Sequence, residues 1–193
     1  MFDGNDVPPS DAALIRRTAA GESSAFDILV RRHQAAVRRF TRELAGDPAQ
    51  AEDALLETFL AAWRGSARRR DDSVSVLTWL LTLARQALTR QNLGRQPAVQ
   101  AAENTPLREL AQAAGWGRSG LAAESTGRQA LETAFAALNP ADREILVLRD
   151  LEGLAEEEAA AVIGTSEAVV RARLHRARLR LLAKLREGGS DGG

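Results

Sequence analysis

One stretch near the C-terminus limits the possible folds more than any other part of the sequence. Five apolar residues recur there at spacings of four, three, four and four, the period of an α-helix with one buried side. Alanine and leucine, which enter helices at little cost, dominate the chain, whereas aromatic residues are only 4 % and tyrosine is absent. The sequence therefore predicts an all-α protein. The predicted buried stripe comprises Val170, Leu174, Ala177, Leu181 and Leu185.

The opposite side of this predicted helix is basic. From Arg171 to Arg186 there are six arginines, one lysine and no acidic residue. A short acidic segment precedes the basic one, and Gly164 separates the two, with Ser166 as the expected N-cap. A short helix, a turn with a glycine and a longer helix form the outline of a helix-turn-helix. Because arginine pairs bidentately with guanine and with phosphate, the pattern favours DNA binding over a merely solvated surface.

The total charge conceals this pattern. The chain has 26 basic and 26 acidic residues, so its formal net charge is zero. Seven acids stand against two arginines over residues 142–158, directly before the basic stretch. Segregated charge of this kind decides which partners a protein attracts more than the total does.

The composition also excludes several classes of function. Cysteine is absent and there are only two histidines, so we expect no disulfide, no metal site and no cofactor. No paired carboxylates in an apolar setting, nucleophile elbow or phosphate loop occurs, so we expect no catalytic residue and no enzyme. The apolar runs are too short to span a membrane and the N-terminus does not resemble a signal peptide. We therefore expect a cytoplasmic protein without membrane insertion.

Stop signals divide the chain into two helical domains of predicted ranges 11–92 and 128–187. Ser10 is the expected N-cap of the first helix, and Gly46 to Pro48 forms a stop between the second and third helices. Residues 93–127 carry Pro, Gly, Asn and Ser and are predicted to form a flexible linker with one short helix over 107–114. Disordered tails are predicted at 1–10 and 188–193. The predicted helices are 11–20, 23–45, 49–64 and 74–91 in the first domain, and 128–138, 140–151, 155–164 and 166–187 in the second.

Both halves resemble one protein family. The segment "LNPADREILVLRDLEGLAEEEAAAVIGTSEAVVRARLHRARLRLLAKL" is similar to region four of extracytoplasmic-function (group IV) sigma factors of bacterial RNA polymerase. In the first half, "LIRRTAAGESSAFDILVRRHQAAVRRF", "AEDALLETFLAAW" and "TWLLTLARQ" resemble region two of the same family in order and spacing. The resemblance implies a region two four-helix bundle and a region four helix-turn-helix.

The resemblance also implies partners. In such proteins region two binds the clamp helices of the largest polymerase subunit and opens the minus-ten promoter element, and region four contacts the minus-thirty-five element in the major groove. Expected partners are thus core RNA polymerase, promoter DNA and an anti-sigma factor. On this sequence the residues implied to bind polymerase are Glu52, Asp53, Leu56, Glu57 and Leu60.

DNA contacts are implied in both regions. Arg171, Ala172, His175 and Arg176 align with the base-contacting positions of the family. Two other arginines of this helix are expected to contact phosphate or to form internal ion pairs, and a basic loop in region two is expected to meet the single strand. The full predicted set is Arg68, Arg69, Arg70, Ser166, Arg171, Ala172, Arg173, His175, Arg176 and Arg178.

Four other residues have simpler expected roles. Trp63 and Trp79 stand at helical positions among leucines and are expected in the core, while His33 is expected at the surface. Trp116, between glycines of the linker, contacts either another protein or one of the domains; the sequence does not choose between the two.

The chain departs from the family pattern at several positions. It has Leu56 in place of Gln, Val169 in place of Thr, and Ala172 and Ala155 in place of Ser. The last change removes a helix N-cap worth about 1 kcal/mol. Three functions are compatible with these departures: an alternative sigma factor with unusual promoter preference, a sigma-like accessory or decoy that does not open promoters alone, and a conventional helix-turn-helix regulator. The presence of both regions in order favours the alternative sigma factor.

Overall fold

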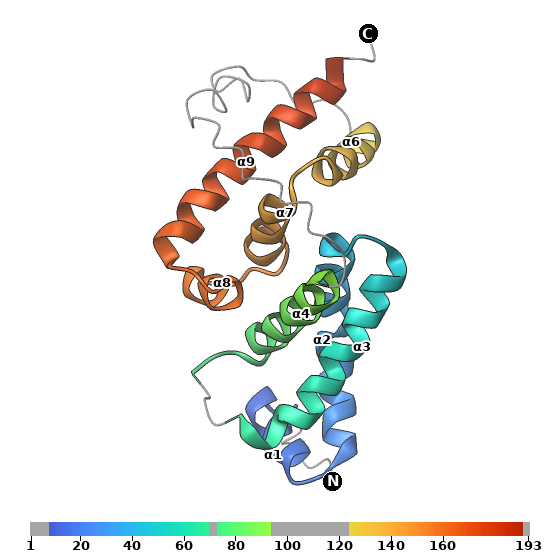
Figure 1. Ribbon diagram of the computed structural model, residues 1–193, viewed down its shortest axis with the longest axis vertical. Helices are drawn as coiled ribbons and strands as arrows, with labels where there is room; N and C mark the ends of the chain where they lie inside the picture. Colours follow the sequence, from blue (N-terminus) through green and yellow to red (C-terminus); the bar gives the residue numbers. More distant parts are fainter. Residues whose placement is uncertain (1–7, 70–72, 94–123, 191–193) are drawn as a thin grey trace, which may run out of the picture. The chain divides into compact units, whose positions relative to one another are not determined.

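The structure, a computed structural model, describes residues 8–69, 73–93 and 124–190. The predicted linker helix over 107–114, Trp116, Arg70 and most of the N-terminal tail lie outside the described residues. The described part consists of helices and their short connections, which confirms the all-α fold class. The chain divides into two compact units, Met1–Asn92 and Leu93–Gly193 (Figure 1).

The described residues of unit 1 form four α-helices and one short 3₁₀ turn. Their ends follow local signals: the Ser10 side chain accepts a hydrogen bond from the Ala13 N–H at 3.3 Å, and Asp47 caps the third helix by accepting from the Gln50 N–H at 2.8 Å. Pro48 occupies the first turn of that helix, where its missing N–H costs nothing. The elements are α1 (Asp11–Ala19), α2 (Ser23–Leu44), α3 (Pro48–Gly65), η1 (Ser66–Arg68) and α4 (Val76–Leu93).

The core of unit 1 is aliphatic, with Phe40 as its largest fully buried side chain. Helix α2 packs between α1 and α3, since it contacts both. Two features join α3 to α4: the Gln50 side-chain amide donates to Asn92 Oδ1 at 2.8 Å, and Gly65 approaches Trp79 so closely that a Cβ would lie 3.3 Å from the indole. The bundle is therefore closed by contacts at both ends of α3.

His33 is buried, so its expected place at the surface is wrong. Its Nε2 lies 2.6 Å from Asp11 Oδ2, and the Arg32 guanidinium donates to the other oxygen of the same carboxylate. Because α1 folds back onto α2, the first residue of α1 covers a histidine that periodicity alone leaves exposed. The Asp11 carboxylate thereby ties the first two helices together.

Unit 2 consists of α6 (Glu124–Ala136), α7 (Pro140–Leu146), the π-helical turn η2 (Val147–Leu151), α8 (Glu156–Ile163) and α9 (Glu167–Ser190). Helix α6 begins inside the predicted linker, and α9 continues past the predicted boundary at 187 to Ser190. The predicted helix over 140–151 is instead α7 followed by the wider turn of η2. Helix α9 contacts α6, α7 and α8, and Figure 1 shows it as the longest helix of the unit.

The buried side of α9 changes along its length. The first three residues of the predicted stripe are buried, but Leu181 and Leu185 are only half-buried. Leu179 and Ala183 are buried in their place. Three helices pack against α9, so more than one side of it is covered, and a single stripe describes only its first half.

A surface ion pair closes the turn between α1 and α2. Gly21 has φ +92°, a left-handed conformation that favours glycine, and Arg17 Nε donates across the turn to Glu22 Oε2 at 2.7 Å. The hydrogen bonds from Arg17 and, secondly, Ser24 lower the pKa of Glu22 to about 2.

Arg17→Ala is expected to return the pKa of Glu22 toward its ordinary value of 4.5, because the largest cause of the shift is removed. A depressed carboxyl pKa means that the pair stabilises the fold above pH 4.5 and loses this contribution as the pH falls through about 2. A carboxyl ¹³C NMR titration measures the midpoint directly. Ser24→Ala is the control and should move it less; an unchanged midpoint in Arg17→Ala would contradict the assignment.

Candidate functional site

Helices α8 and α9 form a helix-turn-helix. Gly164 ends α8 with φ +76°, a conformation that a residue with a Cβ adopts only under strain. The Ser166 hydroxyl then accepts from the Val169 N–H at 3.4 Å at the start of α9, in the position expected for its N-cap. These two residues set the chain reversal that gives α9 its direction relative to α8.

The start of α8 lacks a side-chain cap, in agreement with the change of Ser to Ala. Ala155 has no acceptor for the first-turn N–H groups, but the Glu158 carboxylate accepts from the Ala155 N–H at 3.0 Å. One half of a capping box is therefore kept. The three consecutive glutamates 156–158 also stabilise the positive end of the helix dipole.

Two exposed arginines of α9 are held by acidic residues of the preceding elements. Arg171 Nη1 lies 2.6 Å from Glu156 Oε2 of α8. Arg178 makes a two-pronged pair with Asp150 of η2, with Nε 3.1 Å from Oδ2, and this hydrogen bonding raises the pKa of Arg178. Of the two roles expected for Arg178, phosphate contact and internal ion pair, the isolated chain shows the second.

A third arginine of α9 is paired in the interior. Arg180 Nη1 lies 2.6 Å from Asp142 Oδ2, and Asp142 is only 2 % exposed. The same carboxylate oxygen accepts from Asn139 Nδ2 at 2.7 Å. Because a buried carboxylate requires a partner charge and hydrogen bonds, this cluster fixes α9 against the start of α7.

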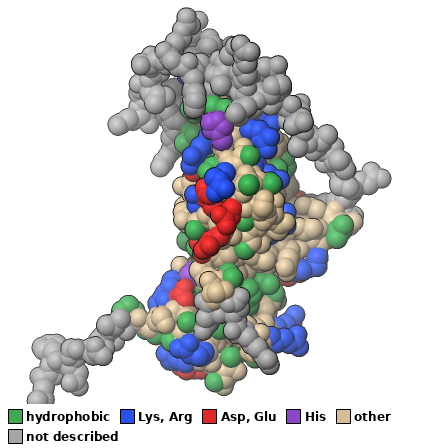
Figure 2. Space-filling model, turned by 90° about the vertical axis from the view of Figure 1, so that its left-hand side faces the viewer, with side chains coloured by type: hydrophobic (Ala, Val, Ile, Leu, Met, Phe, Trp, Pro, Cys, Tyr) green, Lys and Arg blue, Asp and Glu red, His purple; other side chains and the backbone are tan. Residues whose placement is uncertain are grey.

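The outward side of the first half of α9 carries two further arginines. Val169, Ala172, Arg173 and Arg176 have spacings of three, one and three, so they share one side of the helix. Val169 is 39 % exposed, Ala172 is exposed, and both arginines are half-buried without an ion pair to any described residue. We call these four residues the outer face of α9. His175 is exposed on the neighbouring side. Figure 2 shows acidic and basic side chains lying beside one another on the face in view.

The acids of α3 that were predicted to bind polymerase differ in their surroundings. Glu52 Oε1 lies 3.3 Å from Arg38 Nη1, and Glu57 Oε1 accepts from Arg90 at 3.1 and 2.6 Å. Asp53 is exposed and forms no ion pair with any described residue. Of the three acids predicted to bind polymerase, Asp53 is thus the one without an ion pair among the described residues.

Beside Asp53, α3 presents an exposed apolar row. Leu56 is 62 % exposed, Leu60 45 % and Trp63 37 %, at spacings of four and three along one side of the helix. We call these three residues the α3 apolar stripe. The rings of Trp63 and Phe26 pack in a T-shaped arrangement, with centroids 5.1 Å apart.

The expected core position of Trp63 is therefore wrong. Over a third of its surface remains exposed although its ring packs against Phe26. The spacing of Leu56, Leu60 and Trp63 was visible in the sequence and could have identified the stripe. Leu56 and Leu60 are in the predicted polymerase-binding set, and only Trp63 was missed, because an aromatic residue among leucines at helical spacing is more often buried. Trp79 is half-buried.

The predicted basic loop of unit 1 is partly engaged within the unit. The Arg69 guanidinium lies 5.3 Å from the centre of the Trp79 ring and donates to the Val74 carbonyl. Arg68 is exposed at the end of η1. Arg70 lies outside the described residues, so the structure gives only Arg68 as an exposed cation of this group.

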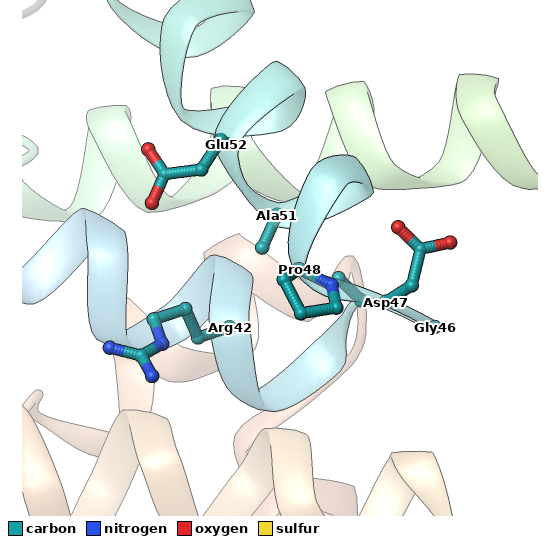
Figure 3. Close-up of a pocket in the computed structure, with 7 residues that line it drawn as sticks. Arg42, Gly46, Asp47, Pro48, Ala51 and Glu52 are labelled. Carbon is teal, nitrogen blue, oxygen red and sulfur yellow. The ribbon is translucent and has the colours of Figure 1, made fainter.

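The described part of the chain has one depression to consider as a small-molecule site. A depression of about 520 Å³ lies at the turn between α2 and α3, lined by Arg42, Ala45, Gly46, Asp47, Pro48, Ala51 and Glu52. Figure 3 shows the Asp47 carboxylate on the opposite side of Pro48 from Arg42 and Glu52, so the polar groups do not converge. Among the described residues no group of His, Asp and Glu could hold a metal ion, and no helix has the length and hydropathy needed to cross a membrane.

Comparison with known proteins gives the family. The sequence profile of sigma-70 region 2 matches residues 29–95, and that of sigma-70 region 4 matches residues 128–181. The RNA polymerase sigma factor NccH of Alcaligenes xylosoxydans is 31 % identical over 183 residues, covering 92 % of this chain and 96 % of NccH. The ECF RNA polymerase sigma factor SigM of Mycobacterium tuberculosis is 31 % identical over 172 residues, covering 89 % and 83 %. The chain belongs to the extracytoplasmic-function sigma factors of RNA polymerase.

A solved structure supports the same assignment. The sigma factor RpoE of Bartonella quintana, in complex with the anti-sigma factor NepR, matches with a TM-score of 0.62 and 25 % identity over 83 % of this chain and 96 % of that one. The α3 apolar stripe thus lies in sigma region 2 and the helix-turn-helix in sigma region 4. This family of alternative sigma factors is not a class of enzymes.

Asp142→Ala is expected to lower the free energy of unfolding of this sigma factor by about 3–5 kcal/mol, because the Arg180 guanidinium loses the buried carboxylate with which it pairs. Lys184→Ala, which breaks the exposed pair with Glu187, is the matched control on the same helix and should cost less than about 1 kcal/mol. Urea unfolding followed by circular dichroism measures both. Equal losses in the two variants would show that the Asp142 cluster does not anchor α9.

Proposed function

We propose that this alternative sigma factor binds core RNA polymerase through the α3 apolar stripe together with Asp53, and contacts the minus-thirty-five promoter element through the outer face of α9. One observation carries the proposal: sigma regions 2 and 4 of one chain expose two surfaces of different chemistry, apolar on α3 and arginine-bearing on α9. A protein that binds polymerase and promoter DNA acts where these partners are, so we place it in the cytoplasm. It would carry out no catalytic step of its own.

The α3 surface has the properties of a protein interface. Buried anchor residues with an aromatic member carry most of the binding energy of such interfaces, and a charged group at the rim sets orientation and association rate. The α3 apolar stripe supplies the anchors and Asp53 supplies the charge. Glu52 and Glu57 are paired within the unit, so each would have to exchange its arginine before it contacts polymerase.

The α9 surface suits the major groove. The N-terminal half of the second helix of a helix-turn-helix contacts base edges, and arginine pairs bidentately with guanine. Arg173 and Arg176 are available for this without breaking an ion pair within the described residues. Arg171, Arg178 and His175 lie toward the other side of the helix, where the two arginines reach phosphate only after release from their carboxylates. Ser166, at the start of α9, contributes its backbone N–H near the duplex.

Promoter opening requires contacts with the single strand. We assign these contacts to the basic loop after α3, with Arg68 as the exposed member and Arg70 two residues further along the sequence. Arg69 supports the loop by packing on Trp79, and would contact DNA only by leaving that ring.

An anti-sigma factor is the proposed restraining partner. The support is the solved complex of RpoE with the anti-sigma factor NepR, together with the apolar side chains that α3 exposes in the isolated chain. A protein that covers the α3 apolar stripe would compete directly with polymerase for the same residues.

Reconstituted transcription tests the proposal. The purified chain is mixed with core polymerase and a library of genomic promoter fragments, and run-off transcripts are sequenced. Specific transcripts that depend on the chain support it. Binding to core polymerase without transcripts indicates the accessory function, duplex binding without polymerase binding indicates a conventional regulator, and binding to neither indicates a protein decoy.

Leu60→Ala is expected to weaken binding to core polymerase by at least about fivefold, since truncating a buried anchor costs more than about 1 kcal/mol. Leu131→Ala on α6 is the matched control, because both leucines are 45 % exposed. Fluorescence anisotropy of a labelled chain against core polymerase measures the two dissociation constants. Equal affinities of the two variants would exclude the α3 apolar stripe from the interface.

Arg176→Ala is expected to weaken holoenzyme binding to the preferred minus-thirty-five sequence by about 1–3 kcal/mol and to relax specificity at one base pair. Arg178→Ala should instead lower binding to all sequences and flatten the salt dependence, as loss of a phosphate contact does. Competition binding with specific and random duplexes at several salt concentrations separates the two. Equal loss on both duplexes for Arg176→Ala would overturn its assignment.

A further inference from the structure

The outer face of α9 begins with an apolar patch at the place where a DNA-contacting helix enters the groove most deeply. Val169 lies in the first turn of α9 and is 39 % exposed, and Ala172 follows one turn later and is also exposed. Because 39 % of its surface is exposed, part of the Val169 side chain is available to contact a ligand. At both positions the family pattern has a hydroxyl-bearing residue, Thr or Ser.

The neighbours of this patch define the ligand. Arg173 stands four residues after Val169 and Arg176 four residues after Ala172, so each apolar residue has an arginine next to it on the same side. From Arg171 to Arg186 no acidic residue interrupts the helix. A surface that combines methyl groups with guanidinium groups matches thymine beside guanine or phosphate, because thymine alone among the DNA bases presents a methyl group in the major groove.

We infer that Val169 and Ala172 recognise the C5-methyl groups of thymine in the promoter duplex, beside a guanine that Arg176 or Arg173 contacts. The inference rests on the proposed function and adds to it the kind of base that this helix selects. The side chains of valine and alanine have neither a hydrogen-bond donor nor an acceptor. This chain therefore selects by apolar contact at two positions where family members with Thr or Ser can form hydrogen bonds.

Deoxyuridine tests the inference, because it differs from thymine only in lacking the methyl group and keeps the same pairing and the same O4 acceptor. The best promoter selected by the holoenzyme is prepared with each thymine of the minus-thirty-five element replaced in turn by deoxyuridine. Wild-type holoenzyme is expected to lose about fourfold in affinity at one or two of these positions, the effect of one methyl group leaving an apolar contact.

The protein side of the contact is removed with Val169→Ser and Ala172→Gly, which take away the methyl groups of the two side chains. Each variant is expected to bind the thymine and deoxyuridine duplexes equally at the position that it contacts. Leu182→Ser is the matched control: this residue is 37 % exposed on the second half of the same helix and should keep the fourfold preference. Retained circular dichroism and core-polymerase binding show that each variant is folded.

The outcomes separate the inference from the proposed function. If the holoenzyme selects no duplex at all, the proposed function fails. If it selects a specific duplex but all deoxyuridine duplexes bind as tightly as thymine, or Val169→Ser and Ala172→Gly keep the full preference, methyl recognition is wrong while the proposed function stands. If either variant instead weakens binding to core polymerase and not to DNA, the apolar patch contacts protein, and the inference is overturned.

Discussion

The carboxylate of Asp142 is the contact on which the geometry of the helix-turn-helix unit depends. It is buried, it is paired with Arg180 and hydrogen-bonded by Asn139, and it therefore fixes α9 relative to α7. Two exposed pairs, Arg171 with Glu156 and Arg178 with Asp150, hold α9 against α8 and η2 in the same way. The acidic stretch over residues 142–158 thus supplies the carboxylates that position the basic helix α9.

The same division between paired and unpaired charge operates in the first unit. Arg38 and Arg90 hold two of the three acids of α3, and Asp53 is exposed beside an apolar row. On α3 and α9 internal ion pairs thus engage part of the charge that the sequence displays. The surfaces that we assign to partners are the α3 apolar stripe with Asp53, and two arginines with Val169 and Ala172 on α9.

Much of this could be predicted from the sequence because the signals are local. Helix ends follow from Ser10, Asp47 with Pro48, and Gly164 with Ser166, which act within one turn of the backbone. The predictions that failed depend on which helix covers which side. Burial of His33 requires the return of α1, and exposure of Trp63 depends on how much of its ring the neighbouring helices cover. Neither is contained in helical periodicity.

The sequence by itself determined the all-α class, the order of the helices and the two family regions, since propensity, caps and motif spacing are properties of neighbouring residues. Only the tertiary structure decided which charges are free. Seven acids and a run of arginines predict attraction between them, but not that Arg171, Arg178 and Arg180 are engaged while Arg173 and Arg176 are not. That choice depends on the angles at which α7, η2 and α8 meet α9, and ion pairs form only within about 4 Å.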